Sequence, residues 1–71
     1  LDGGNDGLDL IKKVIYKSKN ILKIKGTLAL EIGNEQLIKV SKILRNNNFK
    51  IIENIKDYNE NTRCLISIFN N

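Results

Sequence analysis

The sequence predicts a small α/β domain in the order helix, strand, helix, strand, strand. Three observations lead to this prediction. Residues 27–32 form a nearly continuous apolar run between Gly26 and Gly33, which is typical of a strand buried on both faces. Helical patterns of apolar residues lie on both sides of this run. Two further strand-like segments follow at 49–55 and 63–69. Together these elements predict one piece of an open α/β sheet, within a single domain spanning 1–71.

Composition limits the classes of function. The chain has 71 residues, with 12 Lys and Arg against 8 Asp and Glu. This net charge of +4 is mild and the lysines are spread along the chain, so a nucleic-acid partner is allowed but not expected. No apolar run approaches the roughly 18 residues of a membrane span, which argues against a membrane protein. A single cysteine, Cys64, excludes a disulfide framework and indicates a reducing, cytoplasmic compartment.

A loop and a helix open the chain. Residues 1–7, Leu-Asp-Gly-Gly-Asn-Asp-Gly, are too rich in glycine and short polar residues for regular structure. Asp6 is the predicted N-cap of a helix over 8–22. The predicted inner stripe of this helix consists of Ile11, Val14, Ile15, Ser18, Ile21 and Leu22. Four lysines face the other way, and we favour a solvated face over a phosphate-binding stripe.

A second helix follows the apolar strand. Gly33 turns the chain, and Asn34 is the predicted N-cap of a helix over 35–46. Its predicted inner stripe consists of Leu37, Val40, Ser41 and Leu44. Three consecutive asparagines end it, because asparagine competes for backbone hydrogen bonds and tolerates left-handed dihedrals.

The last two strands differ in their faces, and this difference predicts the order of the sheet. Phe49, Ile51 and Ile55 share one predicted face of 49–55, while the other face is mixed, so an edge position is expected. Residues 63–69 are apolar on both faces and should be central. We therefore predict that the last strand runs antiparallel between 27–32 and 49–55.

Several separated motifs, in order and in spacing, carry a resemblance to a known family. They are Leu-Asp-Gly-Gly-Asn-Asp-Gly-Leu-Asp at 1–9, Leu22 to Gly26, Leu-Glu-Ile-Gly at 30–33 with Gln36, and Lys56-Asp57 with Arg63. With the inserted antiparallel strand, they resemble the carboxyl-terminal half of the Rossmann-like class I S-adenosylmethionine-dependent methyltransferases. Within that class they resemble the release-factor glutamine methyltransferases, the HemK family. The chain departs from the family at Ile24 and Lys25, which replace a proline and a glycine, and at 59–61, which lack a glycine.

The resemblance implies methyl transfer from S-adenosylmethionine to the glutamine side-chain amide of the Gly-Gly-Gln motif in peptide chain release factors. In the family an Asn-Pro-Pro-Tyr motif positions that amide, and a glycine-rich loop after the first strand holds the cofactor. The chain has no proline and no strand before its first glycines. Catalytic, cofactor-binding and metal residues are therefore not expected in this chain, which should be inactive alone.

Two sets of residues are nevertheless candidates for a role. The opening loop follows the catalytic motif in the family, so the resemblance implies that it borders the substrate entrance; its members are Asp2, Gly3, Gly4, Asp6 and Gly7. Glu31 is an odd residue in a buried strand, because an unpaired buried carboxylate costs several kcal/mol. The inserted topology predicts a structural ion pair between Glu31 and Arg63, which we favour over a catalytic acid. Cys64 is expected to be a packing residue.

Two other functions stay open at this point. One is a methyltransferase of the same fold that acts on nucleic acid, and the other is a small interaction module that binds through its lysine face. The chain begins with Leu1 and contains no methionine, so we expect a segment of a longer protein. Without further strands, 27–32 would present an unpaired edge. The segment should then need its amino-terminal half or self-associate.

Overall fold

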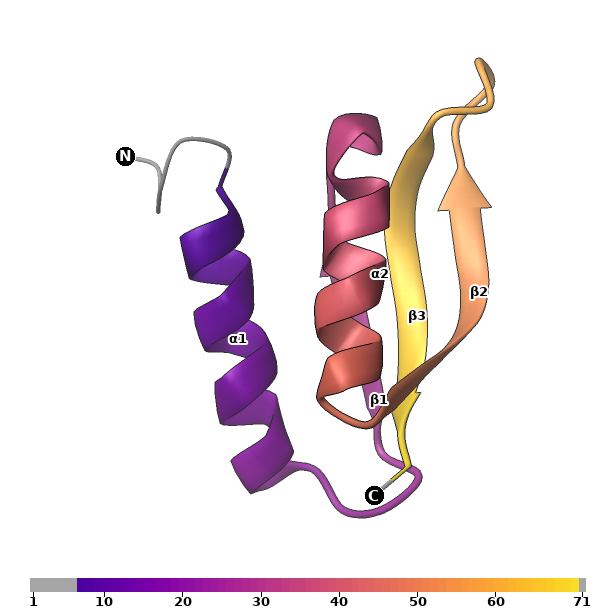
Figure 1. Ribbon diagram of the computed structural model, residues 1–71. Coiled ribbons are helices and arrows are strands. Elements are labelled where there is room, and N and C mark those ends of the chain that lie inside the picture. Colours follow the sequence, from indigo (N-terminus) through magenta and orange to yellow (C-terminus); the bar gives the residue numbers. More distant parts are fainter. Residues whose placement is uncertain (1–6, 71) are drawn as a thin grey trace.

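The computed structural model describes residues 7–70 and has two helices on one face of a three-stranded sheet (Figure 1). The elements in chain order are α1 (Leu8–Ile21), β1 (Thr27–Glu31), a 3-10 turn (Asn34–Gln36), α2 (Leu37–Asn46), β2 (Phe49–Lys56) and β3 (Thr62–Phe69). The strand order is β1-β3-β2, and β3 runs antiparallel to both neighbours. The predicted insertion of the last strand is therefore confirmed.

The core lies between the sheet and the helices. Alternate residues of β3, among them Leu65 and Phe69, are buried against the helices, as the period of two in a strand requires. The apolar core consists of Ile15, Leu30, Ile32, Val40, Leu44, Phe49, Leu65 and Phe69. The rings of Phe49 and Phe69 pack with centroids 5.2 Å apart and join the start of β2 to the end of β3. Each buried apolar side chain contributes roughly 1.5 to 3 kcal/mol.

The outer face of β1 differs from the prediction. Thr27, Ala29 and Glu31 are exposed, so within residues 7–70 this strand is buried on one face only. The reason is that both described helices pack on the opposite face of the sheet. An apolar run indicates that a strand is buried, but it does not indicate which elements of a protein pack against each face of that strand.

The first helix also departs from its predicted stripe. Ile15 and Ser18 are buried, but Val14 is 38% exposed and Ile21 78% exposed. Together with the exposed Leu10 they form an apolar stripe on α1. Lys19 donates a hydrogen bond to Asn47, just beyond α2, so the side of α1 that carries Lys19 faces α2. Ile21 lies two residues further on, and the stripe therefore faces away from α2.

A β-bulge in β2 overturns one predicted face. The pairing passes from Ile51 opposite Ser67 to Glu53 opposite Ile66, which leaves Ile52 as an extra residue. The alternation reverses after the bulge: Asn54 lies opposite Leu65 on the inner face, and Ile55 moves to the outer face. The prediction that Ile55 shares a face with the other apolar residues of β2 is therefore wrong.

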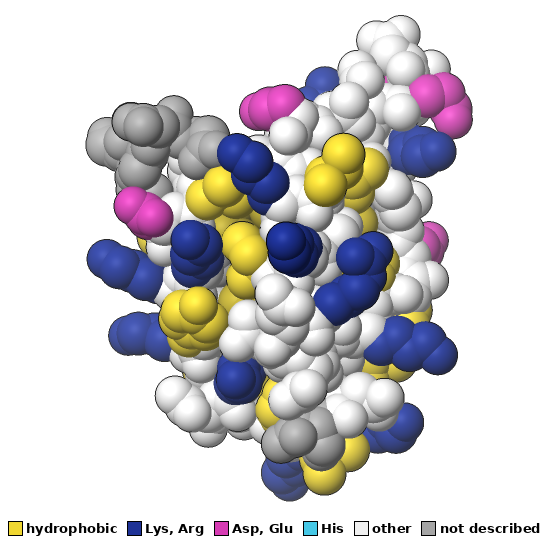
Figure 2. Space-filling view, viewed as in Figure 1, with side chains coloured by type: hydrophobic (Ala, Val, Ile, Leu, Met, Phe, Trp, Pro, Cys, Tyr) yellow, Lys and Arg dark blue, Asp and Glu magenta, His cyan; other side chains and the backbone are white. Residues whose placement is uncertain are grey.

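The outward surface of the two helices is strongly basic. Figure 2 shows Lys and Arg side chains spread over α1 and α2, on the side of the molecule turned away from the sheet. None of the helices within residues 7–70 is long and apolar enough to cross a membrane.

Candidate functional site

The carboxyl end of β1 is where several of the motif residues meet. The start of α1, the start of α2 and the β2–β3 hairpin all lie at this end of the molecule (Figure 1). In open α/β sheets, ligands bind outside the carboxyl ends of the parallel strands. This end is therefore the candidate functional site of the chain.

Gln36 connects two glycines of the site. Its Oε1 accepts a hydrogen bond from the backbone N–H of Gly33 at 2.9 Å, and this bond closes the turn that follows β1. On its other side, a Cβ placed on Gly7 would lie 3.2 Å from Gln36 Nε2. Gly7 occupies the N-cap position of α1 with φ of 77°, a left-handed conformation that favours glycine. The predicted N-cap, Asp6, lies outside the described residues.

Asn34 has a different role from the predicted one. Gly33 occupies the N-cap position of the 3-10 turn that opens the second helical segment, and Asn34 makes no cap. Its Oδ1 instead accepts the backbone N–H of Thr62 at 2.9 Å. Thr62 is buried, so this bond satisfies a donor that water does not reach. The turn after β1 is thus tied to the first residue of β3, 28 positions away.

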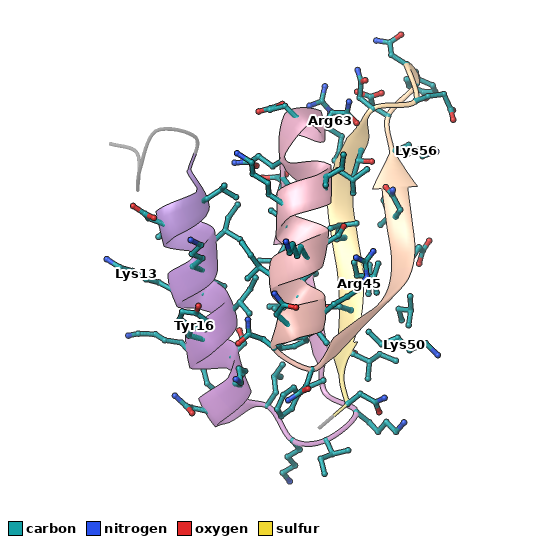
Figure 3. All side chains as sticks on the ribbon, viewed as in Figure 1. Lys13, Tyr16, Arg45, Lys50, Lys56 and Arg63 are labelled. Atoms are coloured by element: carbon teal, nitrogen blue, oxygen red, sulfur yellow. The ribbon has the colours of Figure 1, made fainter. Side chains whose placement is uncertain are left out.

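The predicted ion pair between Glu31 and Arg63 is wrong. Glu31 is exposed, so the buried carboxylate that motivated the pair does not exist. Glu31 lies opposite Cys64 on the outer face of the sheet. Arg63 is skipped where the pairing passes from Ile55 opposite Cys64 to Lys56 opposite Thr62, so it is an extra residue at an irregularity of β3. Arg63 Nε instead donates to Asp57 Oδ2 at 2.9 Å (Figure 3 labels Arg63 at this end).

Asp57 organises the hairpin between β2 and β3. Its Oδ1 accepts the backbone N–H groups of Asn61 and Asn59 at 3.0 and 2.8 Å, while its Oδ2 accepts from Arg63. The pKa of Asp57 is lowered from its ordinary value, chiefly by the Asn61 hydrogen bond, with smaller contributions from Asn59 and Arg63. These bonds fix a turn in which Glu60 adopts a positive φ of 64°.

The described residues supply positioning groups at this site. Asn34, Gln36 and Asp57 each bind backbone N–H groups of the chain itself. Within residues 7–70 no cluster of three or more His, Cys, Asp or Glu side chains is placed to hold a metal ion. Of the predicted substrate-proximal loop, Gly7 is described, while Asp2, Gly3, Gly4 and Asp6 lie outside the described residues.

A separate groove lies away from this end, between α2 and the edge of β2. It has a volume of about 850 Å³ and is lined equally by apolar and polar residues, with Arg45 and Asn54 among the polar ones. Asn54 reaches the groove because the bulge at Ile52 turns it to the inner face. Sequence periodicity gave no signal for this placement, since one inserted residue reverses every face that follows it.

Comparison with known proteins places the chain beside one group of enzymes. It is 40% identical over 68 residues to the release factor glutamine methyltransferase of Clostridium acetobutylicum, which covers 96% of this chain and 24% of the relative. It is 45% identical over 62 residues to the enzyme of the same name from Fusobacterium nucleatum, covering 87% of this chain and 18% of the relative. The corresponding protein of Clostridium botulinum is 46% identical over 57 residues.

The resemblance deduced from the motifs is therefore confirmed. The chain spans no more than about a quarter of the length of these curated relatives. No family model matches the chain. No solved structure matches it either.

Proposed function

We propose that this chain is part of a release factor glutamine methyltransferase and forms the carboxyl-terminal end of its Rossmann-like, S-adenosylmethionine-dependent domain. The observation that carries the proposal is the 40% identity to an enzyme of that name over nearly the whole chain. The strand order β1-β3-β2, with an antiparallel strand inserted before the edge, supports it independently. Such an enzyme would act in the cytoplasm, where release factors work.

The proposed reaction transfers a methyl group from S-adenosylmethionine to the side-chain amide nitrogen of glutamine in the Gly-Gly-Gln motif of a release factor. An amide nitrogen is a poor nucleophile because its lone pair is delocalised into the carbonyl. Catalysis must therefore come largely from holding the nitrogen in line with the methyl group, and such positioning can lower a barrier by several kcal/mol. We assign this positioning to an Asn-Pro-Pro-Tyr motif elsewhere in the parent enzyme.

The described residues do not fit a cofactor cradle. The turn after β1 contains one glycine, Gly33, and a Cβ there would lie 2.5 Å from Glu35 Oε2. The space beside Gly33 is therefore occupied by the Glu35 carboxylate of the same chain. In a glycine-rich loop that binds a cofactor, the corresponding space is occupied by the ligand. We therefore assign S-adenosylmethionine to the part of the parent enzyme beyond residues 7–70.

In this proposal the chain contributes to the reaction by positioning other parts of the enzyme. Gln36 and Asn34 fix the turn at the carboxyl end of β1, and Gln36 also packs against Gly7 at the start of α1. Gly7, the last residue of the predicted loop, therefore lies at the end of the sheet where ligands of such folds bind. We propose that this loop, with Asp2, Gly3, Gly4, Asp6 and Gly7, borders the entrance for the release factor.

The test uses the full-length protein that carries residues 1–71. It is incubated with methyl-labelled S-adenosylmethionine and a purified release factor, and the label is located by peptide mass spectrometry. We expect one methyl group on the glutamine of Gly-Gly-Gln, and none when that glutamine is replaced by alanine. Residues 1–71 alone should transfer no label. Absence of transfer, or transfer to nucleic acid only, would reject the proposed substrate.

A further inference from the structure

The charges of the chain are segregated between its two layers. Within α1 and α2 there are seven Lys and Arg residues and one acidic residue, Asp9. The rest of residues 7–70 carries five basic and five acidic side chains, so the sheet and loops are neutral. The net charge of +4 hides this asymmetry, because it adds a basic helix layer to a neutral sheet layer and to Asp2 and Asp6 at the start of the chain.

The seven cations define one surface, which we call the basic helix face. Those of α1 are Lys12, Lys13, Lys17 and Lys19, and those of α2 are Lys39, Lys42 and Arg45. Figure 1 shows α1 and α2 running side by side, and Figure 2 shows that their Lys and Arg side chains spread over the same side of the molecule. Such a surface produces a positive potential that attracts polyanions.

Several cations of this face are exposed and open to a ligand, while Lys19 is held by its hydrogen bond to Asn47. On the helices, Lys13, Lys17 and Lys42 are exposed. In Figure 3 the Lys13 side chain projects away from α1 into solvent.

An aromatic ring lies among these charges. Tyr16 is 52% exposed on α1, between Lys13 and Lys17 in the sequence. Exposed aromatic rings on a basic surface are the platforms on which the bases of single-stranded nucleic acids stack, and each stacked base contributes about 1 to 3 kcal/mol.

The composition of the face favours nucleic acid over a protein partner. Six of its seven cations are lysine. Protein interfaces are enriched in arginine and depleted in lysine, because the arginine fork matches carboxylates in two-point contacts. Lysine acts as a hydrated point charge, which suits non-specific binding of phosphates by release of counterions.

We propose that the basic helix face binds single-stranded RNA, with the lysines on backbone phosphates and Tyr16 as a stacking platform. This binding is additional to the proposed methyl transfer and uses a different surface from the end of β1. It gives the parent enzyme an affinity for RNA-rich surroundings without any sequence preference.

The test measures binding of a fluorescent 20-nucleotide RNA of mixed sequence to the full-length protein by anisotropy, between 50 and 200 mM salt. The variant Lys13→Gln, Lys17→Gln, Lys42→Gln removes three charges from the face. Because each phosphate contact on a single strand contributes about 0.7 to the slope of log affinity against log salt, the slope should fall by about 2. Affinity at 100 mM salt should fall by at least about tenfold, and Tyr16→Ala should lower it by roughly tenfold.

The matched control is Lys23→Gln, Lys50→Gln, Lys56→Gln, which changes the net charge equally but lies outside the two helices. It should change the slope by less than about 0.5. Equal effects of the two triple variants, or wild-type binding that ignores salt, would overturn the proposal. If the first variant loses binding to the release factor but keeps binding to RNA, the proposal is also overturned, and the ligand of this face is an acidic protein. Methyl transfer is scored separately, so failure here leaves the proposed function standing.

Discussion

The two edges of the sheet are built differently. β2 contains a bulge and carries Lys50, Glu53 and Lys56, the devices by which natural edge strands avoid pairing with other chains. β1 pairs regularly over all five residues, with Glu31 as its one charge. The exposed apolar stripe of α1 faces away from α2, and the free edge of β1 is the edge away from β3. This difference indicates that β2 is made to face water and β1 is made to be covered.

The largest expected effect is therefore self-association through β1. Residues 1–71 alone should form dimers or larger species in sedimentation velocity experiments, because the apolar edge offers unpaired backbone groups. Ala29→Lys should weaken this association at least tenfold, since it places a charge on the outer face of β1.

The matched change on the other edge is Ile52→Lys, at the bulge of β2. It should leave the association unchanged, because that edge does not pair. Monomeric behaviour of residues 1–71 with cooperative thermal unfolding would contradict the comparison of the two edges.

The next effect concerns the hydrogen bond between Asn34 and Thr62, which joins the turn after β1 to the start of β3. Asn34→Ala leaves the buried N–H of Thr62 without an acceptor, and a donor of this kind costs about 1 to 3 kcal/mol. Urea unfolding of the full-length protein should report this loss. Glu35→Ala, on an exposed neighbour in the same turn, should change stability by less than about 0.5 kcal/mol. Equal losses for the two variants would mean that the Asn34 bond is not what joins β1 to β3.

A smaller effect of opposite sign is expected at two left-handed residues. Lys25 precedes β1 with φ of 73°, and Glu60 lies in the hairpin of β2 with φ of 64°. Lys25 stands where the family resemblance implies a glycine, and Glu60 lies within 59–61, where the resemblance implies a glycine that this chain lacks. Lys25→Gly and Glu60→Gly should each stabilise by roughly 0.5 to 1 kcal/mol in thermal unfolding.

Asn48 is the natural control for these substitutions. It also has a positive φ, of 69°, but asparagine tolerates this conformation. Asn48→Gly should therefore change stability by no more than a few tenths of a kcal/mol. A larger gain at Asn48 than at Lys25 would show that the left-handed conformation is not the source of the strain.

The sequence contained the strand order but not the details of the site. The mixed face of β2 and the two apolar faces of β3 were sufficient to place β3 in the centre, because burial follows from composition. The position of Ile55 was not predictable, since a bulge of one residue leaves no mark in the hydrophobic pattern.

The site was harder to predict because its contacts are long-range. Asn34 stands at a position typical of an N-cap, but its side chain accepts the backbone N–H of the distant Thr62. The turn after β1 is closed instead by Gln36, whose side chain accepts the backbone N–H of Gly33. The buried pair predicted for Glu31 depends on cover over both faces of β1, and the described residues cover only one. The lysines of α1 are visible as one face in the sequence, but their continuation onto Lys39, Lys42 and Arg45 of α2 is not, because it depends on how the two helices lie side by side.

The smallest expected effect is the pH dependence of stability that Asp57 gives to the hairpin at the end of β2, the edge strand that faces water. The lowered pKa of Asp57 means that the folded hairpin prefers the carboxylate, chiefly through the Asn61 N–H, so the charge stabilises the fold at neutral pH. Asp57→Asn keeps an acceptor but removes the charge, and should lower the unfolding temperature slightly at pH 7. The difference should begin to shrink below the ordinary pKa of Asp, about 3.9, and vanish as pH falls through the lowered value. A difference that persists at pH 2 would show that the turn depends on the shape of Asp57 and not on its charge.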